Sequence, residues 1–190
     1  AARARLREMA AHPKCVAIGE TGLDTYWIRH RPDETAPLAV QEEALRFHID
    51  VAVVAGKALM IHNREADADL LRVLGDAPTP KYTILHCFSS PTAVAEEAIA
   101  RGYVLSFAGN VTFKNNEELR QIAAMVPIDQ LLIETDAPFM TPVPYRGAKN
   151  EPAFIGHTAL CVAVARSMPV AKLAEAVAAN FDRVYQMAKP

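Results

Sequence analysis

Long apolar runs and a signal-peptide pattern are both missing from this sequence. A membrane-spanning helix needs about 18 or more consecutive apolar residues, and no run here approaches that length. The longest candidate, VAVVAGKALMIH, is interrupted by Lys57. The first residues lack the apolar core of a secretory signal. We therefore expect a cytoplasmic protein that does not bind a membrane.

Cysteine is scarce. The three cysteines, Cys15, Cys87 and Cys161, include no pair at the spacing of a zinc motif. An odd number also argues against a framework of disulfides. We expect small buried thiols, as is usual in a reducing compartment.

A strong excess of one charge is absent as well. The formal net charge is −2 and the sequence pI is about 6.3. No large basic field therefore covers the molecule. If it binds nucleic acid, binding must be local, through a few cationic side chains or through metal ions.

What the sequence does contain is a regular alternation of apolar strands with helical segments. Alternation of this kind predicts a parallel sheet, either a closed barrel or an open doubly wound sheet. The strands are apolar throughout, as expected when both faces are buried. We predict one domain over residues 1–190, with a polar loop at 24–37. The expected strands are 16–20, 58–62, 82–87, 103–108 and 131–135, and the expected helices are 1–11, 38–55, 66–74 (ended by Gly75), 91–101, 116–125, 153–167 and 170–187.

Five strands are fewer than a closed (β/α)8 barrel needs, and such barrels usually have about 250 residues. The sequence also begins on a helix that leads into a strand. We therefore expect three βα units upstream of residue 1.

Four of the expected strands end in a residue that can bind a metal: VAIGE in Glu20, ALMIH in His62, TILH in His86 and LLIETD in Asp136. The carboxyl ends of parallel strands meet at one edge of the sheet, where barrels of this type place their active site. Imidazoles and carboxylates suit Zn, Mn, Fe or Co, and carboxylate-rich sites also accept Mg. The pattern predicts one shared metal site, with either one or two ions.

Taken singly, each of these residues has a simpler interpretation. A lone histidine in an apolar segment is more often a hydrogen-bonded structural residue than a ligand. A carboxylate at the end of a buried strand can be held in an ion pair, since an isolated buried charge is very unfavourable. Only the convergence of four such positions favours the metal site.

Seven segments, in order along the chain, resemble the motif series of the TatD family. The members of that family are metal-dependent nucleases of the amidohydrolase superfamily. The segments are GETGLD (19–24), IHNRE (61–65), LHCFSS (85–90), SFAGNVTFK (106–114), ETDAPF (134–139), RGAKNEP (146–152) and NFDRVY (180–185). The resemblance implies a TIM-type (β/α)8 barrel, here lacking roughly the first three βα units.

The resemblance also implies roles for particular residues. Glu20 would bridge two divalent metal ions, Mg²⁺ or Mn²⁺, with Zn²⁺ as an alternative. His62 and His86 would complete the protein ligands of one ion. Asp136 would bind the other ion and accept a proton from the attacking water, so that Asp136 and Glu20 are the expected catalytic residues. Arg64 would grip a phosphate, although an ion pair with a neighbouring acidic residue, Glu65 or Asp67, is the simpler alternative.

The family's metal site includes a His-x-His pair on its first strand, and no two of the six histidines here are two positions apart. Either the polypeptide extends upstream, or the protein is truncated. A five-stranded remnant would expose two sheet edges and apolar barrel surface, which favours aggregation. We therefore favour an upstream extension.

Further residues are expected around the site. Tyr26, Trp27 and Arg29 follow Glu20, and aromatic rings beside cations suit stacking on unpaired bases with phosphate contact. Alternatively, the two rings fold back onto the barrel rim. Glu134 lies two residues before Asp136 and points to the same side of the strand, where it would hydrogen-bond a metal ligand. Asn150 is expected to shape the loop after Asp136.

Three functional hypotheses follow. The first is a hydrolase of phosphodiesters, a 3′→5′ exonuclease with single-stranded DNA as its partner. The second is a D-aminoacyl-tRNA deacylase or another ester or amide hydrolase, because a fold and a metal site do not choose a substrate. The third is an inactive truncated barrel that serves as an interaction module. The sequence favours no oligomeric state.

Overall fold

The computed structural model describes residues 2–187. They form two compact units. The first unit runs to His86 and includes the segment that begins at Val184, and the second unit comprises Cys87–Arg183. Each unit has its own parallel strands, helices and buried core.

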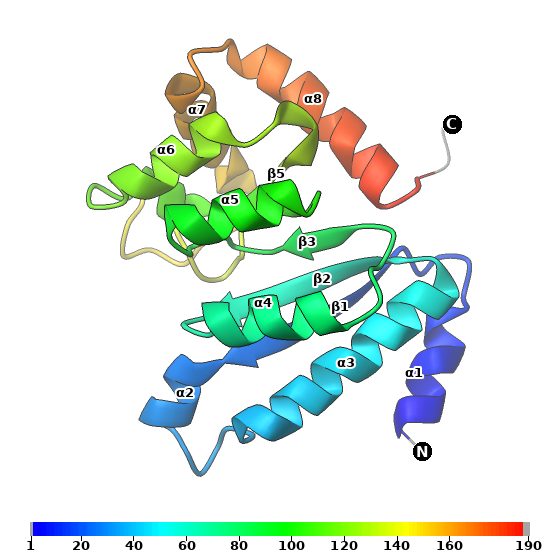
Figure 1. Cartoon of the computed structure of the whole chain (residues 1–190). Coiled ribbons are helices and arrows are strands. Elements are labelled where there is room, and N and C mark those ends of the chain that lie inside the picture. The colour runs from blue at the N-terminus through cyan, green and yellow to red at the C-terminus, as the bar shows by residue number, and fades with distance from the viewer. Residues whose placement is uncertain (1, 188–190) are drawn as a thin grey trace. The chain divides into compact units, whose positions relative to one another are not determined.

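The first unit consists of three parallel strands with two helices along one face (Figure 1). β1 (Ala17–Asp24) pairs with β2 (Ala58–Arg64), which pairs in turn with β3 (Thr83–Leu85). α3 (Leu38–Ala55) and α4 (Asp67–Asp76) both contact β1 and β2, and α1 (Ala2–Ala10) packs against α3. The short helix α2 (Thr25–His30) follows β1 directly.

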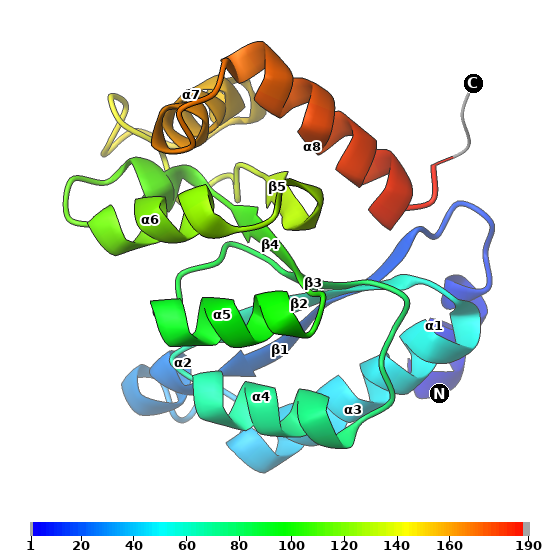
Figure 2. The same ribbon diagram turned by 45° about the horizontal axis from the view of Figure 1, so that its top comes forward.

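The second unit repeats the same alternation. β4 (Val104–Phe107) pairs in parallel with β5 (Leu131–Ile133). α5 (Thr92–Ala100) packs against β4 and against α6 (Glu117–Met125), which it accompanies side by side in Figure 2. α7 (Ile155–Ala165) packs on α6, and α8 (Val170–Val184) follows. Three short 3-10 turns complete the unit: η1 (Gly109–Thr112), η2 (Ile128–Gln130) and η3 (Pro152–Phe154).

The five predicted strands are all present and the parallel α/β class is confirmed, but three details of the prediction are wrong. β1 does not end at Glu20 but continues to Asp24. The predicted loop 24–37 contains α2, because the Asp24 carboxylate caps that helix by accepting a hydrogen bond from the Trp27 amide at 2.8 Å. Gly75 does not end the fourth helix but lies inside it, one residue before its last.

The core of each unit is built from strand residues and from the helix residues that pack on them. From Thr21 onward alternate residues of β1 are buried, and on β2 Leu59 and Ile61 are buried while Met60 and His62 are not. The intervening residues form the opposite face of the strands. In the first unit the fully buried large side chains are those of Leu23, Leu45, Ile49, Leu59, Ile61, Leu70 and Ile84; in the second they are Leu105, Phe107, Ile122, Leu131 and Leu173. The residues left on the opposite face of β1 and β2 include those expected to bind metal.

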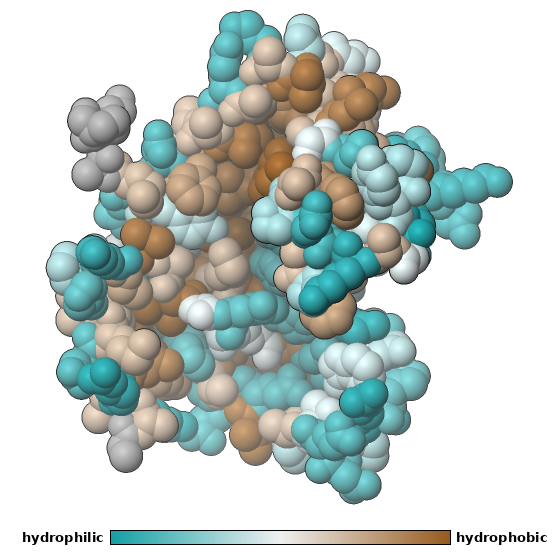
Figure 3. Space-filling view, turned by 180° about the vertical axis from the view of Figure 1, so that it is seen from behind, coloured by the Kyte–Doolittle hydropathy of each residue, from teal (hydrophilic) through white to brown (hydrophobic). Residues whose placement is uncertain are grey.

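Helix α8 carries an apolar surface as well as a buried one. Leu173 is buried, whereas Val170 and Phe181 are exposed on the same helix. Brown and tan atoms are accordingly visible in the upper part of the view in Figure 3, where α7 and α8 lie. Across residues 2–187, no single helix combines the length and apolar composition of a membrane span. Residues Pro152–Ala165 and α8 reach that length and composition only when they are taken together, and a 109° bend separates them.

The three cysteines form no disulfide and are only partly buried, so the expectation of buried thiols is wrong in degree. Burial nevertheless raises the pKa of the Cys161 thiol above its ordinary value. The protonated thiol is the weaker nucleophile, and Cys161 therefore has a structural rather than a reactive environment.

Gly22 allows β1 to lie unusually close to β2. Its φ is +154°, and a Cβ added there would lie 1.9 Å from the carbonyl oxygen of His62. Gly19 is similar, since its φ is +146° and its Cβ would lie 2.6 Å from the carbonyl oxygen of Met60. Glycine is the residue that tolerates both this φ and this approach. The two glycines flank Glu20 and set its distance from β2.

We predict that Gly22→Ala destabilises the protein by about 3 kcal/mol, because the added methyl group meets backbone rather than a movable side chain. Urea-unfolding midpoints would measure the change. Gly156→Ala is the control: Gly156 lies in α7, and nothing lies within 4 Å of its added Cβ. Alanine should stabilise that helix by up to about 1 kcal/mol. A Gly22→Ala protein as stable as wild type would contradict the close approach of the strands.

Candidate metal centre

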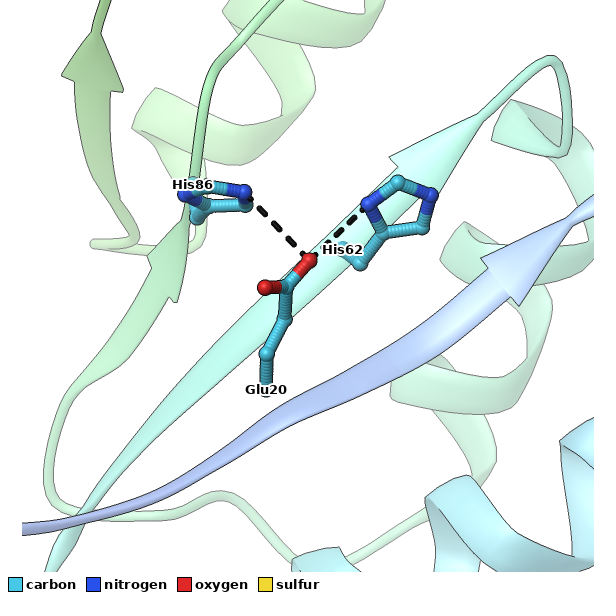
Figure 4. A group of neighbouring side chains, drawn as sticks. All are labelled: Glu20, His62 and His86. Atoms are coloured by element: carbon cyan, nitrogen blue, oxygen red, sulfur yellow. Dashed lines mark ion pairs between the residues drawn. The ribbon is translucent and has the colours of Figure 1, made fainter. Parts of the chain in front are cut away.

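Glu20 reaches the site because β1 is irregular at that position. Ile18 is in register with Leu59 of β2, but Thr21 is in register with Ile61, so the pairing shifts between Ile18 and Thr21. Glu20 lies within this irregularity. Such bulges re-aim a side chain next to functional sites. Figure 4 shows the result, in which the Glu20 carboxylate points between two imidazole rings.

The two histidines come from the neighbouring strands. His62 lies near the end of β2, in register with Gly22. His86 follows the last residue of β3, and its amide donates a hydrogen bond to the Ile61 carbonyl at 3.0 Å, which prolongs the parallel ladder by one residue. Three adjacent strands therefore supply the three side chains. His62 and His86 come from the carboxyl ends of β2 and β3, as predicted, whereas Glu20 lies within β1 rather than at its end.

A single carboxylate oxygen serves both rings. Oε1 of Glu20 lies 3.0 Å from Nδ1 of His62 and 3.3 Å from Nε2 of His86. One ligand atom from each of the three residues falls within 4.8 Å of the others. Ligands about 2.1 Å from one ion at tetrahedral or octahedral angles lie about 3.0–3.4 Å apart. The spacing of this donor set fits a divalent ion.

The cluster is open to solvent on one side. The side chain of Glu20 is 45% exposed and that of His62 is 34% exposed, whereas that of His86 is only 11% exposed. Glu20 is therefore not the buried carboxylate that its place in an apolar strand suggests, since its charge is partly hydrated. What supports the site is the convergence of the three donors, together with an open path for an ion or a substrate.

Asp24 is a fourth member of the cluster, and our sequence analysis missed it. Its Oδ2 lies 3.0 Å from Nε2 of His62, on the side of the ring away from Glu20. The signal was present in the sequence. Glu20, Gly22 and Asp24 are spaced by two, so a strand that continues past Glu20 places all three on one face.

Arg64 and the aromatic residues of α2 lie beside this cluster. The Arg64 guanidinium lies over the Tyr26 ring, 3.7 Å from its centre, and the His30 ring stacks on Tyr26 at 3.9 Å. Two groups this close to one ring centre must lie on opposite faces, so both faces of Tyr26 are occupied. Trp27 is 37% exposed, and its neighbours include Arg31 and Arg64 at 5.0 and 5.4 Å.

The simpler interpretation of Arg64 as an ion-pair partner gains no support from its acidic neighbours. Glu65 pairs with Arg29, and Asp67 accepts a hydrogen bond from Asn63 at 2.6 Å. Arg29 is thus held by Glu65. Arg64, two residues after His62, lies on the same face of β2 as that histidine.

The remaining predicted residues lie in the second unit, after β5. Asp136 has a φ of +53°, and its carbonyl accepts the Phe139 amide at 2.8 Å in a tight turn. The Glu134 carboxylate accepts hydrogen bonds from the Cys87 amide at 2.9 Å and from the Ser106 hydroxyl at 2.5 Å. Glu134 thus fixes the backbone at the residue after His86.

Asn150 is buried and organises the loop in which Asp136 lies. Its amide group donates to the carbonyls of Thr135 and Phe139 at 2.7 and 2.5 Å, and its oxygen accepts the Glu151 amide at 2.9 Å. These bonds connect both ends of the turn around Asp136 to the segment that follows it. The structure therefore brings Glu20, His62 and His86 together in the first unit, and places Asp136, Glu134 and Asn150 in the second.

Adjacent parallel strands thus carry a convergent set of His and Glu side chains, a donor set of the kind found in metal-dependent hydrolases with a parallel α/β fold. The chain belongs to the TatD family, since the family model described as TatD related DNase matches residues 1–186.

Individual relatives agree with this assignment. The chain is 45% identical over 185 residues to a Mycobacterium tuberculosis protein named "Uncharacterized metal-dependent hydrolase TatD", covering 97% of this chain and 70% of that one. It is 32% identical over 192 residues to an Erwinia tasmaniensis protein named "3'-5' ssDNA/RNA exonuclease TatD", covering 97% and 71%.

A solved structure shows the same fold. The crystal structure of YJJV, a TatD homolog from Escherichia coli, superposes with a TM-score of 0.88 at 24% identity. The match covers 98% of this chain and 70% of that chain. The five parallel strands thus correspond to part of a TatD-family barrel.

We predict that Glu20→Gln weakens Mn²⁺ binding, measured by isothermal titration of the full-length protein, by at least about 10-fold, since even partners outside the ligand shell contribute about 10–100-fold. His86→Ala should act in the same direction. Glu43→Gln, an exposed position on α3, removes the same charge away from the site and serves as the control. Equal affinities in all three variants would argue for a plain ion-pair cluster.

Proposed function

We propose that the protein is a divalent-metal-dependent phosphodiester hydrolase, acting as a 3′→5′ exonuclease on single-stranded DNA. The observation that carries the proposal is the Glu20 oxygen shared by the imidazoles of His62 and His86. The TatD related DNase family and a relative named as a 3'-5' ssDNA/RNA exonuclease support the choice of bond. The five strands would form part of a (β/α)8 barrel, with residues 1–190 in one domain.

The proposed site holds two divalent ions, Mg²⁺ or Mn²⁺, with Zn²⁺ as an alternative. Glu20 would bridge them, His62 and His86 would bind one, and Asp136 would bind the other. Such ions supply Lewis acidity toward water and toward phosphate oxygens. Asp136 would accept the proton of the attacking water. The acidic net charge fits this scheme, because the ions rather than a basic surface neutralise the phosphate.

Arg64 and Trp27 are the proposed substrate contacts. Arg64 lies beyond His62 on the same face of β2, about 6–7 Å further along the strand, which suits a neighbouring phosphate. Trp27 is the more exposed aromatic of α2 and is flanked by two guanidinium groups, as in stacking sites for unpaired bases. Tyr26 supports Arg64 rather than a base, because both its faces are occupied.

We predict that His62→Ala and Asp136→Ala each abolish nucleotide release from a 5′-labelled single-stranded oligonucleotide in the full-length protein with Mn²⁺. The measurement is the product ladder on a denaturing gel. Circular dichroism should show an intact fold. Glu43→Gln should retain wild-type release.

The same assay separates the competing functions. A D-aminoacyl-tRNA offered with the oligonucleotide should remain acylated, and preferential deacylation would replace the nuclease with an ester hydrolase. Near-normal nucleotide release by either alanine variant would show that the proposed metal site is wrong. If the wild-type protein binds no Mn²⁺ and hydrolyses neither substrate, the interaction-module hypothesis takes its place.

We predict that Arg64→Ala raises KM for the oligonucleotide by at least about 10-fold with little change in kcat, since hydrogen bonds to charged groups contribute about 1.5–3 kcal/mol. The variant should also lose about one phosphate contact. The slope of log binding constant against log salt concentration should therefore become shallower by roughly 0.7. Trp27→Ala should raise KM by a similar factor through lost stacking, without changing that slope. Trp27→Phe keeps an aromatic face and is the matched control. A reduced salt slope in Trp27→Ala would contradict the stacking role.

A further inference from the structure

Asp24 connects the metal cluster to α2, the helix that carries the proposed substrate contact Trp27. It is the last residue of β1 and the N-cap of α2. Its side chain is only 15% exposed, and each oxygen has a different partner. Oδ1 accepts the Trp27 amide at 2.8 Å, and Oδ2 lies 3.0 Å from Nε2 of His62. The Asp24 carboxylate therefore contacts both the metal cluster, at His62, and the first turn of α2, at Trp27.

The backbone of Asp24 is fixed independently of its side chain. Its amide donates to Oε1 of Gln41 on α3 at 2.8 Å, and the Gln41 amide group donates to the carbonyls of Ala36 and Asp24. Asp24 is also in register with Arg64 across the β1–β2 pair. The Asp24 backbone is thus held by contacts to α3, apart from those its carboxylate makes with His62 and with α2.

The His62 ring lies between two carboxylates. Nδ1 faces Glu20 at 3.0 Å and Nε2 faces Asp24 at 3.0 Å. A neutral imidazole has one lone pair and one N–H, and a metal needs the lone pair. If Nδ1 is the ligand atom, as its position beside Glu20 indicates, the proton must be on Nε2. Asp24 is placed to accept that proton in a hydrogen bond, which fixes both the tautomer and the ring orientation.

We infer that Asp24 is a positioning residue that holds His62 in its metal-binding tautomer and transmits metal binding to α2. This inference rests on the proposed metal site. Because the same carboxylate caps α2, an ion that orders His62 also orders Asp24, and with it the start of the helix that bears Tyr26 and Trp27. The substrate contacts then become better ordered when the metal is bound.

The substitution Asp24→Asn tests the inference. Asparagine is as good an N-cap as aspartate, so α2 can still form. With Oδ1 on the Trp27 amide, its NH₂ faces Nε2 and favours the proton on Nδ1, where it blocks the metal. With the amide reversed, the cap is lost. In either orientation one of the two functions fails.

Mn²⁺ alone is the probe, titrated by calorimetry into the full-length protein without substrate. Asp24→Asn should weaken Mn²⁺ binding by about 10–100-fold. Asp50→Asn, an exposed carboxylate on α3 of the same unit, removes an equal charge and should bind as wild type does. Imidazole ¹⁵N shifts of His62 in metal-free protein should show more proton on Nδ1 in Asp24→Asn than in the wild type.

Hydrogen exchange provides a second readout, and its first measurement needs only the wild-type protein. Adding Mn²⁺ to the wild-type protein should slow exchange in the peptide that contains Thr25–His30, and Asp24→Asn should lose that effect. An unchanged exchange rate in the wild type overturns the coupling, even if Asp24→Asn fails to fold. Affinity in Asp24→Asn within about twofold of wild type overturns the positioning role.

His62→Ala separates the two proposals. If His62→Ala loses Mn²⁺ binding and Asp24→Asn does not, the metal site stands and the role of Asp24 is wrong. If His62→Ala binds Mn²⁺ as tightly as the wild type, the metal site itself is wrong, and both proposals are overturned. If both variants lose affinity and Asp50→Asn does not, both proposals are supported.

Discussion

The close approach of β1 to β2 at Gly22 is the constraint on which the candidate site depends. A Cβ at that position would lie 1.9 Å from the His62 carbonyl oxygen, so the two strands come together there only because the side chain is absent. Glu20 lies two residues before this contact and Asp24 two residues after it. With a period of two, both carboxylates therefore emerge on the face of the strand that carries His62. The His62 ring therefore lies between the carboxylates of Glu20 and Asp24.

Glu20 and Asp24 differ in their surroundings, and each suits a different role. Glu20 is nearly half exposed and shares one oxygen with two imidazoles, which suits a ligand with access to solvent. Asp24 is mostly buried and has both of its oxygens engaged by protein groups, which suits a residue that orients others. The difference in exposure, rather than in residue type, separates the two roles. Asp24 is also the residue at which β1 ends and α2 begins.

Membership of the TatD family and the parallel α/β fold agree with a hydrolase, but neither selects the bond that is cleaved. The choice of substrate depends on what surrounds the cluster. Around it, Arg64 is held over Tyr26, and Trp27 is exposed between guanidinium groups. The exposed aromatic face of Trp27 between cations is the feature from which the single-stranded substrate is proposed, since unpaired bases stack on such faces.

The sequence by itself determined the alternation of five strands and their helices, the family, and the types of the proposed ligands. These features are local, since strand and helix periodicity and motif order can be read along the chain. Even so, the burial expected for Glu20 was wrong, because β1 continues beyond it and leaves its carboxylate at an irregularity open to solvent. Tertiary structure alone decided that one Glu20 oxygen faces two imidazoles, that Asp24 meets the other side of His62, and that Arg64 stacks on Tyr26. Each of these contacts joins residues about 40 or more positions apart, and their distances follow from the register between strands, which no periodicity within a single segment encodes.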